Sequence, residues 1–147
     1  MEYSIREIRE QDYPALISLF QEFAIFEKLP DSMTNSVEQM KSEKEYIHGY
    51  VAVTVADEVV GYVTYFDAYF TWVGRSLYMD DLYVKNSHRG RGIGTRLINR
   101  VIDYARADKC NRLRWQVSEW NKPAIAFYNS LGANIDGTES NCDLKLD

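Results

Sequence analysis

The sequence predicts a mixed α/β fold in one domain, and three observations support this. Residues 3–8 alternate apolar and polar side chains, as a strand with one buried face does. Two strand-like runs, residues 50–56 and 59–66, are joined by the short turn Asp57-Glu58, which favours an antiparallel hairpin. An apolar run over residues 76–84 leads through a glycine-rich loop into an amphipathic helix, as in a strand–helix crossover. Strands that are first antiparallel and then parallel give a single mixed sheet.

The remaining elements follow from periodicity and from turn residues. Asp12 is placed to cap a first helix whose first turn holds Pro14, and residues 36–42 predict a short second helix. Residues 67–75 read as an aromatic-rich loop ahead of the strand at 76–84. The apolar stripe expected to face the core from the first helix consists of Leu16, Ile17, Phe20, Phe23 and Ala24.

The last third of the chain predicts two more helices and two more strands. A helix over residues 95–107 turns Leu97, Ile98, Val101, Ile102 and Ala105 to one side, and residues 113–117 form a strand. A final helix has Pro123 in its first turn and ends at Gly132, and residues 142–146 predict a last strand. The inward face of that helix is expected to hold Ala124, Ile125, Phe127, Tyr128 and Leu131.

Size and composition limit the class of protein. The chain has 147 residues, a usual size for one domain, so residues 1–147 are taken as a single domain with its own core. No apolar run approaches the length of about 18–20 residues that spans a membrane. Charged residues also interrupt the start of the chain, so no signal peptide is expected there. These features predict a cytoplasmic protein with no membrane partner.

Charge and cysteine usage exclude further classes. The net charge of −5 argues against non-specific nucleic-acid binding and suits a cationic small molecule. Cys110 and Cys142 lie far apart, and neither His48 nor His88 completes a metal-ligand spacing with them. We therefore predict no metal site and no nucleic-acid partner.

The most informative segment is Arg89-Gly90-Arg91-Gly92-Ile93-Gly94, which lies between the strand at 76–84 and the helix at 95–107. Glycine lets a backbone approach a ligand closely and adopt positive φ. The amides of such a loop and of the first helical turn together form a site for anions. The segment therefore predicts a pocket for a phosphorylated ligand.

The distribution of charge strengthens this prediction. Residues 85–100 hold five Lys or Arg and no Asp or Glu, while the whole chain has 17 basic and 22 acidic residues. A Walker-type site is excluded because no Gly-Lys-Ser/Thr follows the glycines. A dinucleotide-binding start is disfavoured because the unit comes late in the chain and has a different glycine spacing. The remaining alternative is an ordinary loop before a solvated basic helix.

The order of elements and this loop resemble the GCN5-related N-acetyltransferases (GNAT). Their hallmark is a strand, then Arg/Gln-x-x-Gly-x-Gly/Ala, then a helix, and Val84, residues 89–94 and the following helix fit it. Asn121, Phe127-Tyr128 and Leu131-Gly132-Ala133 resemble the ending of the family. The resemblance covers essentially the whole chain. It implies the acyl-CoA N-acyltransferase fold, a central twisted, mostly antiparallel sheet with a parallel splayed pair and about four helices.

Within that family the chain most resembles the diamine acetyltransferases, which act on spermidine, spermine or thialysine. The likeness rests on residues 72–84, on residues 118–123 (Ser-Glu-Trp-Asn-Lys-Pro) and on Phe26-Glu27-Lys28. The chain departs from the animal enzymes in its shorter hairpin at Asp57-Glu58 and in Asn141-Cys142, where they carry a Trp. It also ends at Asp147, where they continue. These departures put in doubt the preference for polyamine length and the dimer contacts.

The resemblance implies acetyl-CoA as co-substrate and assigns residues to it. The diphosphate is expected at Arg89, Gly90, Arg91, Gly92, Ile93, Gly94 and Thr95. The backbone at Leu82, Tyr83 and Val84 is expected to pair with the pantetheine arm as an added strand would. Asn121 is expected to hydrogen-bond the arm near the thioester; the alternative is a helix cap, and the two roles are compatible.

Catalytic and acceptor residues follow from the same resemblance. Tyr128 is expected to protonate the departing thiolate, since a phenol has an ordinary pKa of about 10; the alternative is a plain core tyrosine. Glu27 is expected to take a proton from the amine, through water, or to hold its distal ammonium; the alternative is a solvated acid at a helix end. Consecutive Asp80 and Asp81 point to opposite faces of a regular strand, and one of them is expected to face a cationic amine; the alternative is an aspartate that caps a neighbouring loop. Trp72 is expected to wall the amine channel through cation–π contact, or else to pack under its loop.

The sequence thus predicts an enzyme that transfers an acetyl group from acetyl-CoA to a primary amine by direct attack in a ternary complex. The acceptor is expected to be a small cation such as a polyamine, a diamine or a thialysine-like amino acid. In one alternative the reaction is the same, but the acceptor is an aminoglycoside-like amine or an amine of a protein. Another is a CoA-binding sensor without catalysis. The resemblance also implies a homodimer.

Overall fold

The computed structural model describes residues 2–146, and the chain divides after Gln116 into two compact units. The first unit contains one sheet whose strands follow chain order, and each neighbouring pair is antiparallel except β4 and β5, which are parallel. This confirms the mixed sheet predicted from the sequence. The prediction of a single domain over residues 1–147 stays a prediction. The strands are β1 (Tyr3–Glu7), β2 (His48–Thr54), β3 (Val59–Phe70), β4 (Gly74–Val84) and β5 (Arg112–Arg114).

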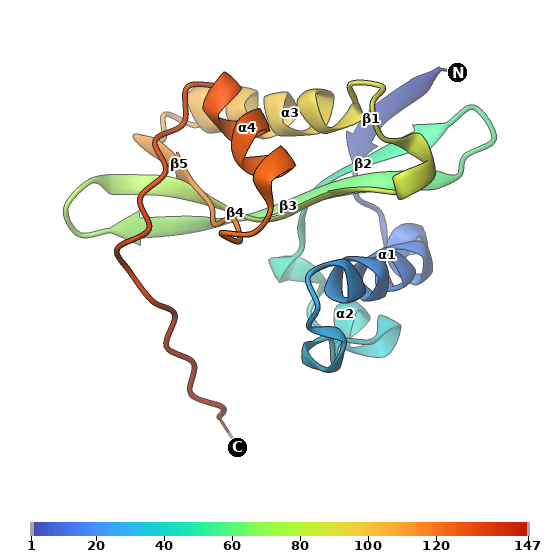
Figure 1. Ribbon diagram of the computed structural model, residues 1–147. Helices are drawn as coiled ribbons and strands as arrows, with labels where there is room; N and C mark the ends of the chain where they lie inside the picture. Colours follow the sequence, from blue (N-terminus) through green and yellow to red (C-terminus); the bar gives the residue numbers. More distant parts are fainter. Residues whose placement is uncertain (1, 147) are drawn as a thin grey trace. The chain divides into compact units, whose positions relative to one another are not determined.

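Helices cover both faces of this sheet (Figure 1). Helix α3 (Ile93–Ala107) lies on one face, while α1 (Tyr13–Phe26) and α2 (Val37–Ser42) lie on the other. Each helix buries an apolar stripe, as the periodicity predicts. The largest fully buried side chains of the helices and the sheet are Leu16, Met40, Val51, Val60, Tyr62, Val63, Leu77, Met79, Ile93, Leu97, Ile98 and Val101. Short 3-10 turns are η1 (Glu10–Asp12), η2 (Pro30–Ser32), η3 (Lys44–Tyr46) and η4 (Asn86–His88).

Strands β3 and β4 are longer than the sequence predicts, and the aromatic loop expected at residues 67–75 is wrong. Asp67 pairs with Leu77 and Phe70 with Gly74, so only residues 71–73 form the turn. The aromatic residues of this segment suit a pleated strand. Gly74 has φ of +97°, which lets the chain reverse directly into β4.

Asp12 does not cap α1, contrary to the prediction. Its carboxylate instead accepts two hydrogen bonds of 2.8 Å from the Arg6 guanidinium and a third from the backbone N–H of Arg9. Asp12 is only 3% exposed. Burial opposes its ionisation, but these hydrogen bonds outweigh burial and lower the pKa of Asp12. The ion pair therefore ties β1 to the start of α1.

The second unit contains one helix, α4 (Lys122–Ser130). Pro123 lies in its first turn, and Gly132 follows its end with φ of +85°, as the sequence predicts. Leu131 is 36% exposed, so its predicted place on the inward face is wrong. The strand predicted at residues 142–146 is also wrong, because those residues form no regular structure. That stretch alternates Leu144 and Leu146 with polar residues, but a strand forms only with a neighbour that completes its hydrogen bonds.

No helix within residues 2–146 combines the length and the apolar character that a membrane crossing requires.

The Arg6–Asp12 pair generates a prediction about acid stability. Because the folded pKa of Asp12 is lowered, its contribution is present above the unfolded pKa of about 4 and is lost as pH falls through the folded value. We expect Asp12→Asn to lower the free energy of unfolding at pH 7 by about 3 kcal/mol and to weaken its dependence on pH below about 4. Urea unfolding between pH 2 and pH 7 measures both effects.

The matched control is Asp57→Asn, since Asp57 lies 3.8 Å from Arg6 but its side chain is 70% exposed. An exposed pair of this kind contributes less than about 1 kcal/mol. Equal losses in the two variants would show that burial does not set the strength of the Asp12 pair.

Candidate functional site

Strand β4 carries most of the predicted site residues, and its register with β3 decides where they face. Tyr83 pairs with Tyr62 and Asp81 with Thr64, so these four side chains share one face of the sheet. This is the face that α1 covers, because Phe20 of α1 meets the ring of Tyr62 edge-on at 5.1 Å. Leu82 and Val84 alternate with them and face α3.

A β-bulge interrupts the strand at Asp80. Thr64 pairs with Asp81 and Tyr65 with Met79, which leaves Asp80 without a partner residue in β3. The backbone N–H of Asp81 donates to Thr64 Oγ1 at 3.3 Å. A bulge bends the strand and redirects the side chains beside it, so the strict alternation assumed from the sequence does not hold here.

The acidic residues predicted for the amine site are shielded from solvent to different degrees: Asp81 and Glu27 are half-buried, and Asp80 is exposed. Burial raises the pKa of Asp81 to about 7, and the charges of Asp80 and Glu27 act in the same direction. The Tyr62 hydroxyl donates to Asp81 Oδ2 at 3.1 Å and acts in the opposite direction. Surrounding protein also raises the pKa of Asp80, although its side chain keeps an exposed surface. The structure therefore brings Asp80, Asp81 and Glu27 together electrostatically.

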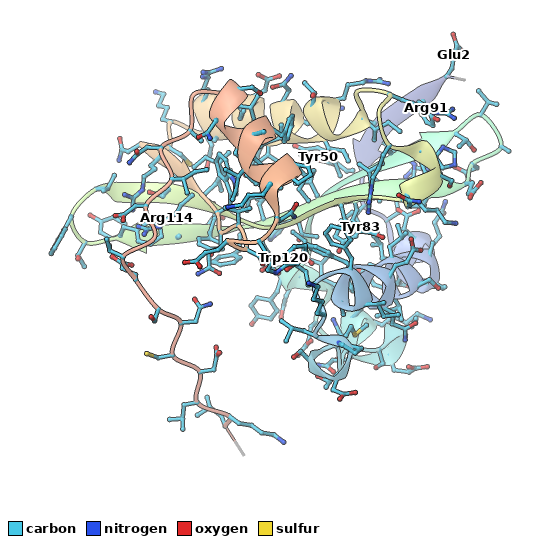
Figure 2. All side chains as sticks on the ribbon, viewed as in Figure 1. Glu2, Tyr50, Tyr83, Arg91, Arg114 and Trp120 are labelled. Carbon is cyan, nitrogen blue, oxygen red and sulfur yellow. The ribbon has the colours of Figure 1, made fainter. Side chains whose placement is uncertain are left out.

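Aromatic packing holds Glu27 near this strand. Phe23 of α1 stacks on Tyr83 with ring centroids 5.0 Å apart, and the Tyr83 hydroxyl donates to Glu22 Oε1 at 3.0 Å. Figure 2 shows Tyr83 on the α1 side of the sheet. Glu27 ends the helix, and its N–H donates to the carbonyl of Phe23. The end of α1 is thus fixed against β4.

The glycine loop has the backbone that the sequence predicts for anion binding. Gly90 and Gly92 both have φ of +78°, where a side chain causes strain, and the space around each Cβ position is open. Helix α3 begins at Ile93 rather than at residue 95, with Gly92 as its N-cap. The amides of Gly92, Ile93, Gly94 and Thr95 therefore belong to the cap and first turn, where N–H groups have no acceptor within the helix.

Three arginines surround the loop and anchor it to two strands. Arg89 Nε donates to the Val84 carbonyl at 2.8 Å, and its guanidinium lies over the rings of Phe26 and Tyr83 at 5.0 and 5.2 Å. Arg91 Nη1 donates to the Tyr3 hydroxyl at 3.0 Å, and Arg96 Nη1 to the Tyr3 carbonyl at 2.9 Å. Positive charge is thus concentrated beside the exposed amides. The sequence predicts that Arg89 and Arg91 lie at this site, but it does not predict Arg96. The position of Arg96 in the first turn of the helix after the loop would have indicated its place here.

Asn121 and Tyr128 lie in the second unit. The Asn121 side-chain oxygen accepts from the backbone N–H of Ala124 at 3.3 Å, which confirms the alternative of a helix cap. Tyr128 is 8% exposed and its ring lies 5.5 Å from that of Phe127. The predicted contact of Asn121 with a pantetheine arm and the predicted acid role of Tyr128 stay predictions.

The structure does not bring Trp72 to the acidic residues. Trp72 is 98% exposed in the turn between β3 and β4. Strand β4 begins at Gly74, seven residues before Asp81, which corresponds to about 23 Å along a strand. In this chain Trp72 therefore lies at the far end of the hairpin from Asp81.

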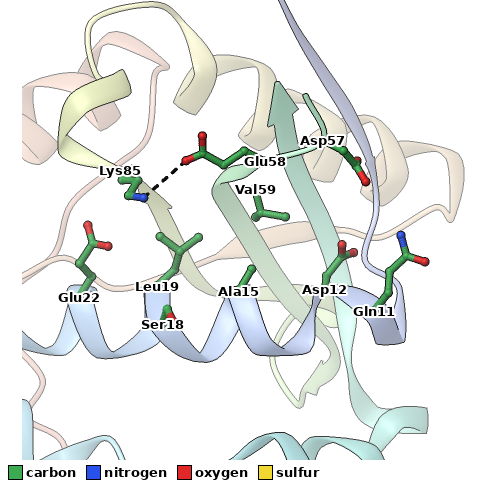
Figure 3. Close-up of a pocket in the computed structure, with 10 residues that line it drawn as sticks. All are labelled: Gln11, Asp12, Ala15, Ser18, Leu19, Glu22, Asp57, Glu58, Val59 and Lys85. Carbon is green, nitrogen blue, oxygen red and sulfur yellow. Dashed lines mark ion pairs between the residues drawn. The ribbon is translucent and has the colours of Figure 1, made fainter. Parts of the chain in front are cut away.

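A separate cavity of about 370 Å³ lies between α1 and the β2–β3 turn (Figure 3). Its polar lining includes Asp12, Glu22, Asp57, Glu58 and Lys85, and Lys85 Nζ lies 3.6 Å from Glu58 Oε2. None of the predicted site residues lines this cavity. The candidate site therefore consists of the β4 acids and the glycine loop.

Over residues 2–146, no three His, Cys, Asp or Glu side chains gather as a metal site requires. The expectation that the protein needs no metal stays a prediction.

Comparison with known proteins decides the family. The model of the acetyltransferase (GNAT) family matches residues 3–133, which include the whole sheet, the glycine loop and α4. The chain belongs to the acetyltransferase (GNAT) family. The predicted resemblance and the predicted fold of this GNAT protein are thereby confirmed.

Individual relatives agree with this assignment. Thialysine N-epsilon-acetyltransferase of Bos taurus is 38% identical over 147 residues, which cover 92% of this chain and 86% of the bovine protein. Spermidine/spermine N(1)-acetyltransferase-like protein 1 of Homo sapiens is 28% identical over 141 residues, covering 89% of this chain and 20% of the human protein. Among solved structures, an aminoglycoside acetyltransferase from an uncultured soil metagenomic sample superimposes with a TM-score of 0.80 at 21% identity. It covers 99% of this chain and 100% of its own, and at that identity it shows the fold alone.

The raised pKa of Asp81 generates a prediction about stability. A carboxyl whose folded pKa lies above its unfolded pKa stabilises the fold when protonated, and this contribution is lost as pH rises between about 4 and 7. We expect Asp81→Asn, which removes the buried charge, to raise the free energy of unfolding at pH 8 by about 2–4 kcal/mol relative to wild type. At pH 4 the two proteins should be nearly equal.

Urea unfolding at both pH values measures this difference. The control is Asp103→Asn, an exposed carboxylate on α3, which should leave stability within about 0.5 kcal/mol of wild type at either pH. A difference between Asp81→Asn and wild type that does not grow with pH would contradict the raised pKa.

Proposed function

We propose that this GNAT protein transfers the acetyl group of acetyl-CoA to a primary amine of a small cationic acceptor, by direct attack in a ternary complex. The proposed acceptor class comprises polyamines, diamines and thialysine-like amino acids. The observation that carries the proposal is an acidic group next to a basic, amide-rich loop: Asp80 and Asp81 lie on the strand that leads into the loop, and Glu27 lies at the end of α1. The 38% identity to a thialysine acetyltransferase supports the acceptor class.

The loop fits the donor by its geometry. Gly90 and Gly92 hold left-handed conformations, and no atom beyond the adjacent residues lies within 4 Å of a Cβ position at either glycine, so a ligand can approach this backbone closely. The first turn of α3 and the guanidinium of Arg91 add favourable charge for a diphosphate. We assign the diphosphate to residues 89–95 and the pantetheine arm to the backbone of Leu82, Tyr83 and Val84. Bound there, acetyl-CoA supplies an acetyl group activated as a thioester.

The acidic group fits a cationic acceptor. Buried carboxylates are costly without a positive partner, and the pKa of Asp81 shows that its own surroundings disfavour its charge. An ammonium group supplies the missing partner. An amine must be neutral to attack, so a carboxylate with a pKa near neutrality is suited to accept its proton, directly or through water. We assign acceptor binding to Asp80, Asp81 and Glu27, with Glu27 also available for proton transfer.

In the transfer, the nitrogen lone pair attacks the carbonyl carbon and the carbon–sulfur bond breaks. The proton of the amine passes to a carboxylate or to water, and the leaving sulfur gains a proton. We assign that last proton to Tyr128, a phenol donor buried in α4. Trp72 stays a predicted acceptor contact, and the predicted homodimer and cytoplasmic location stay predictions.

The proposed function is tested with purified protein, acetyl-CoA and a panel of amines, by following the release of free thiol. We expect turnover with spermidine or thialysine and none with neutral alcohols of similar length. Turnover only with aminoglycosides or with a protein amine would show that the proposed acceptor class is wrong and that the acetyl transfer itself is right. Saturable binding of coenzyme A without turnover of any amine would indicate a sensor domain instead.

The role of Tyr128 is tested by Tyr128→Phe, which keeps the ring and removes the proton. We expect kcat to fall by roughly 100-fold, a usual contribution of general acid catalysis, while the Kd for acetyl-CoA from calorimetry stays within about two-fold. Tyr46→Phe is the control, because Tyr46 is 73% exposed in a short turn far along the chain from the site. Unchanged kcat in Tyr128→Phe would assign the acid to another group.

A further inference from the structure

Tyr62 has a buried hydroxyl that points at the acidic group, and the sequence gives it no role. Its side chain is 0% exposed in the middle of β3, among apolar neighbours. Tyr62 pairs directly with Tyr83 of β4. Asp81 lies two residues before Tyr83 on the same face, so it is diagonally across from Tyr62 and within reach of that long side chain. The hydroxyl donates to Asp81 Oδ2 at 3.1 Å.

The ring of Tyr62 is fixed in place by aromatic contacts. Phe20 of α1 meets it edge-on, with centroids 5.1 Å apart and planes at 65°, and Tyr83 lies beside it at 6.3 Å. Both neighbours belong to the packed core between α1 and the sheet. The phenol oxygen is therefore held at one point relative to β4, and it fixes the carboxylate that it contacts.

The hydroxyl is a permanent donor. Burial first, and then the charge of Asp81, raise the pKa of Tyr62 well above its ordinary value of about 10. The phenol therefore keeps its proton at any ordinary pH, and whenever the pair carries a negative charge that charge lies on Asp81. A buried hydroxyl also requires an acceptor, so the contact is favourable for both groups.

Burial and two neighbouring acids oppose the ionisation of Asp81. Burial, Asp80 on the same strand and Glu27 at the end of α1 each raise its pKa, whereas the hydrogen bond from Tyr62 lowers it. Thr64 on β3 contacts only the backbone N–H of Asp81. The Tyr62 hydroxyl is thus the contact within this group that favours the charged carboxylate.

We propose that Tyr62 is a positioning residue of the acetyl transfer, whose hydroxyl orients the Asp81 carboxylate and holds it ionised toward the ammonium group of the acceptor. This inference rests on the proposed function. Oδ2 is engaged by Tyr62, which leaves Oδ1 to accept from the ammonium group. Asp81 contacts the acceptor, and Tyr62 acts only through Asp81.

Tyr62→Phe tests the proposal because it keeps the ring, its contact with Phe20 and the packing of the core. We expect the acidic limb of the pH profile of kcat/KM for spermidine to move up by about one unit, which lowers kcat/KM about tenfold well below pH 7 and about fivefold at pH 7. The KM for acetyl-CoA should stay within about two-fold. Above pH 9 the variant should approach wild type, because Asp81 is then ionised in both proteins.

The matched control is Tyr50→Phe. Tyr50 is a buried tyrosine on the neighbouring strand β2, 5% exposed, and its ring lies under Arg100 on the other side of the sheet from Asp81. Loss of this hydroxyl should leave the pH profile for spermidine unchanged. An equal shift in both variants would mean that any buried hydroxyl produces the effect, and it would overturn the proposal.

A second readout does not depend on activity. Carbon-13 NMR of protein labelled at aspartate carboxyls follows the titration of Asp81, whose signal is identified by its absence in Asp81→Asn. We expect its apparent pKa to be higher in Tyr62→Phe than in wild type. An unchanged or lower pKa overturns the role of Tyr62 and leaves the proposed function standing. Wild-type protein that acetylates no amine overturns the proposed function, and with it the acceptor part of this inference.

Discussion

The pairing of β3 with β4 is the constraint on which the rest of the first unit depends. Its register places Tyr62 diagonally across from Asp81, and Tyr83 under α1. Its bulge at Asp80 changes the direction of the strand within the acidic group. The far end of the same strand delivers Val84 to the glycine loop, where Arg89 closes back on its carbonyl. One strand thus links the two halves of the candidate site.

The sheet also separates charges that would otherwise neutralise each other. The carboxylate of Asp81 lies on the α1 face, while the exposed amides of the loop, with Arg91 and Arg96 beside them, lie at the start of α3 on the other face. Arg89 is the exception, and its guanidinium lies over the rings of Phe26 and Tyr83. Separate regions of opposite potential suit an anionic donor and a cationic acceptor that must be bound at the same time.

Local patterns were sufficient to predict most elements and the loop. Glycines with positive φ, apolar stripes and the short turn at Asp57-Glu58 act within a few residues, and the structure confirms them. Features that depend on register could not be predicted. Tyr62 looks like any core residue of an apolar strand until pairing brings it to Asp81, 19 positions away. Asp12 has good capping chemistry, but a buried pair with Arg6 stabilises it more.

The contacts of Tyr3 have a practical consequence for anyone producing this protein. Its hydroxyl and carbonyl hold Arg91 and Arg96, so the first strand braces the loop assigned to the donor. A hollow lined by Glu2, Tyr3, Arg91 and Arg96 opens beside it. An acidic affinity tag fused ahead of Tyr3 would start next to this hollow, and its carboxylates would compete there for the guanidinium groups of Arg91 and Arg96. Such a fusion should carry a protease site, and the tag should be removed before any binding constant is measured.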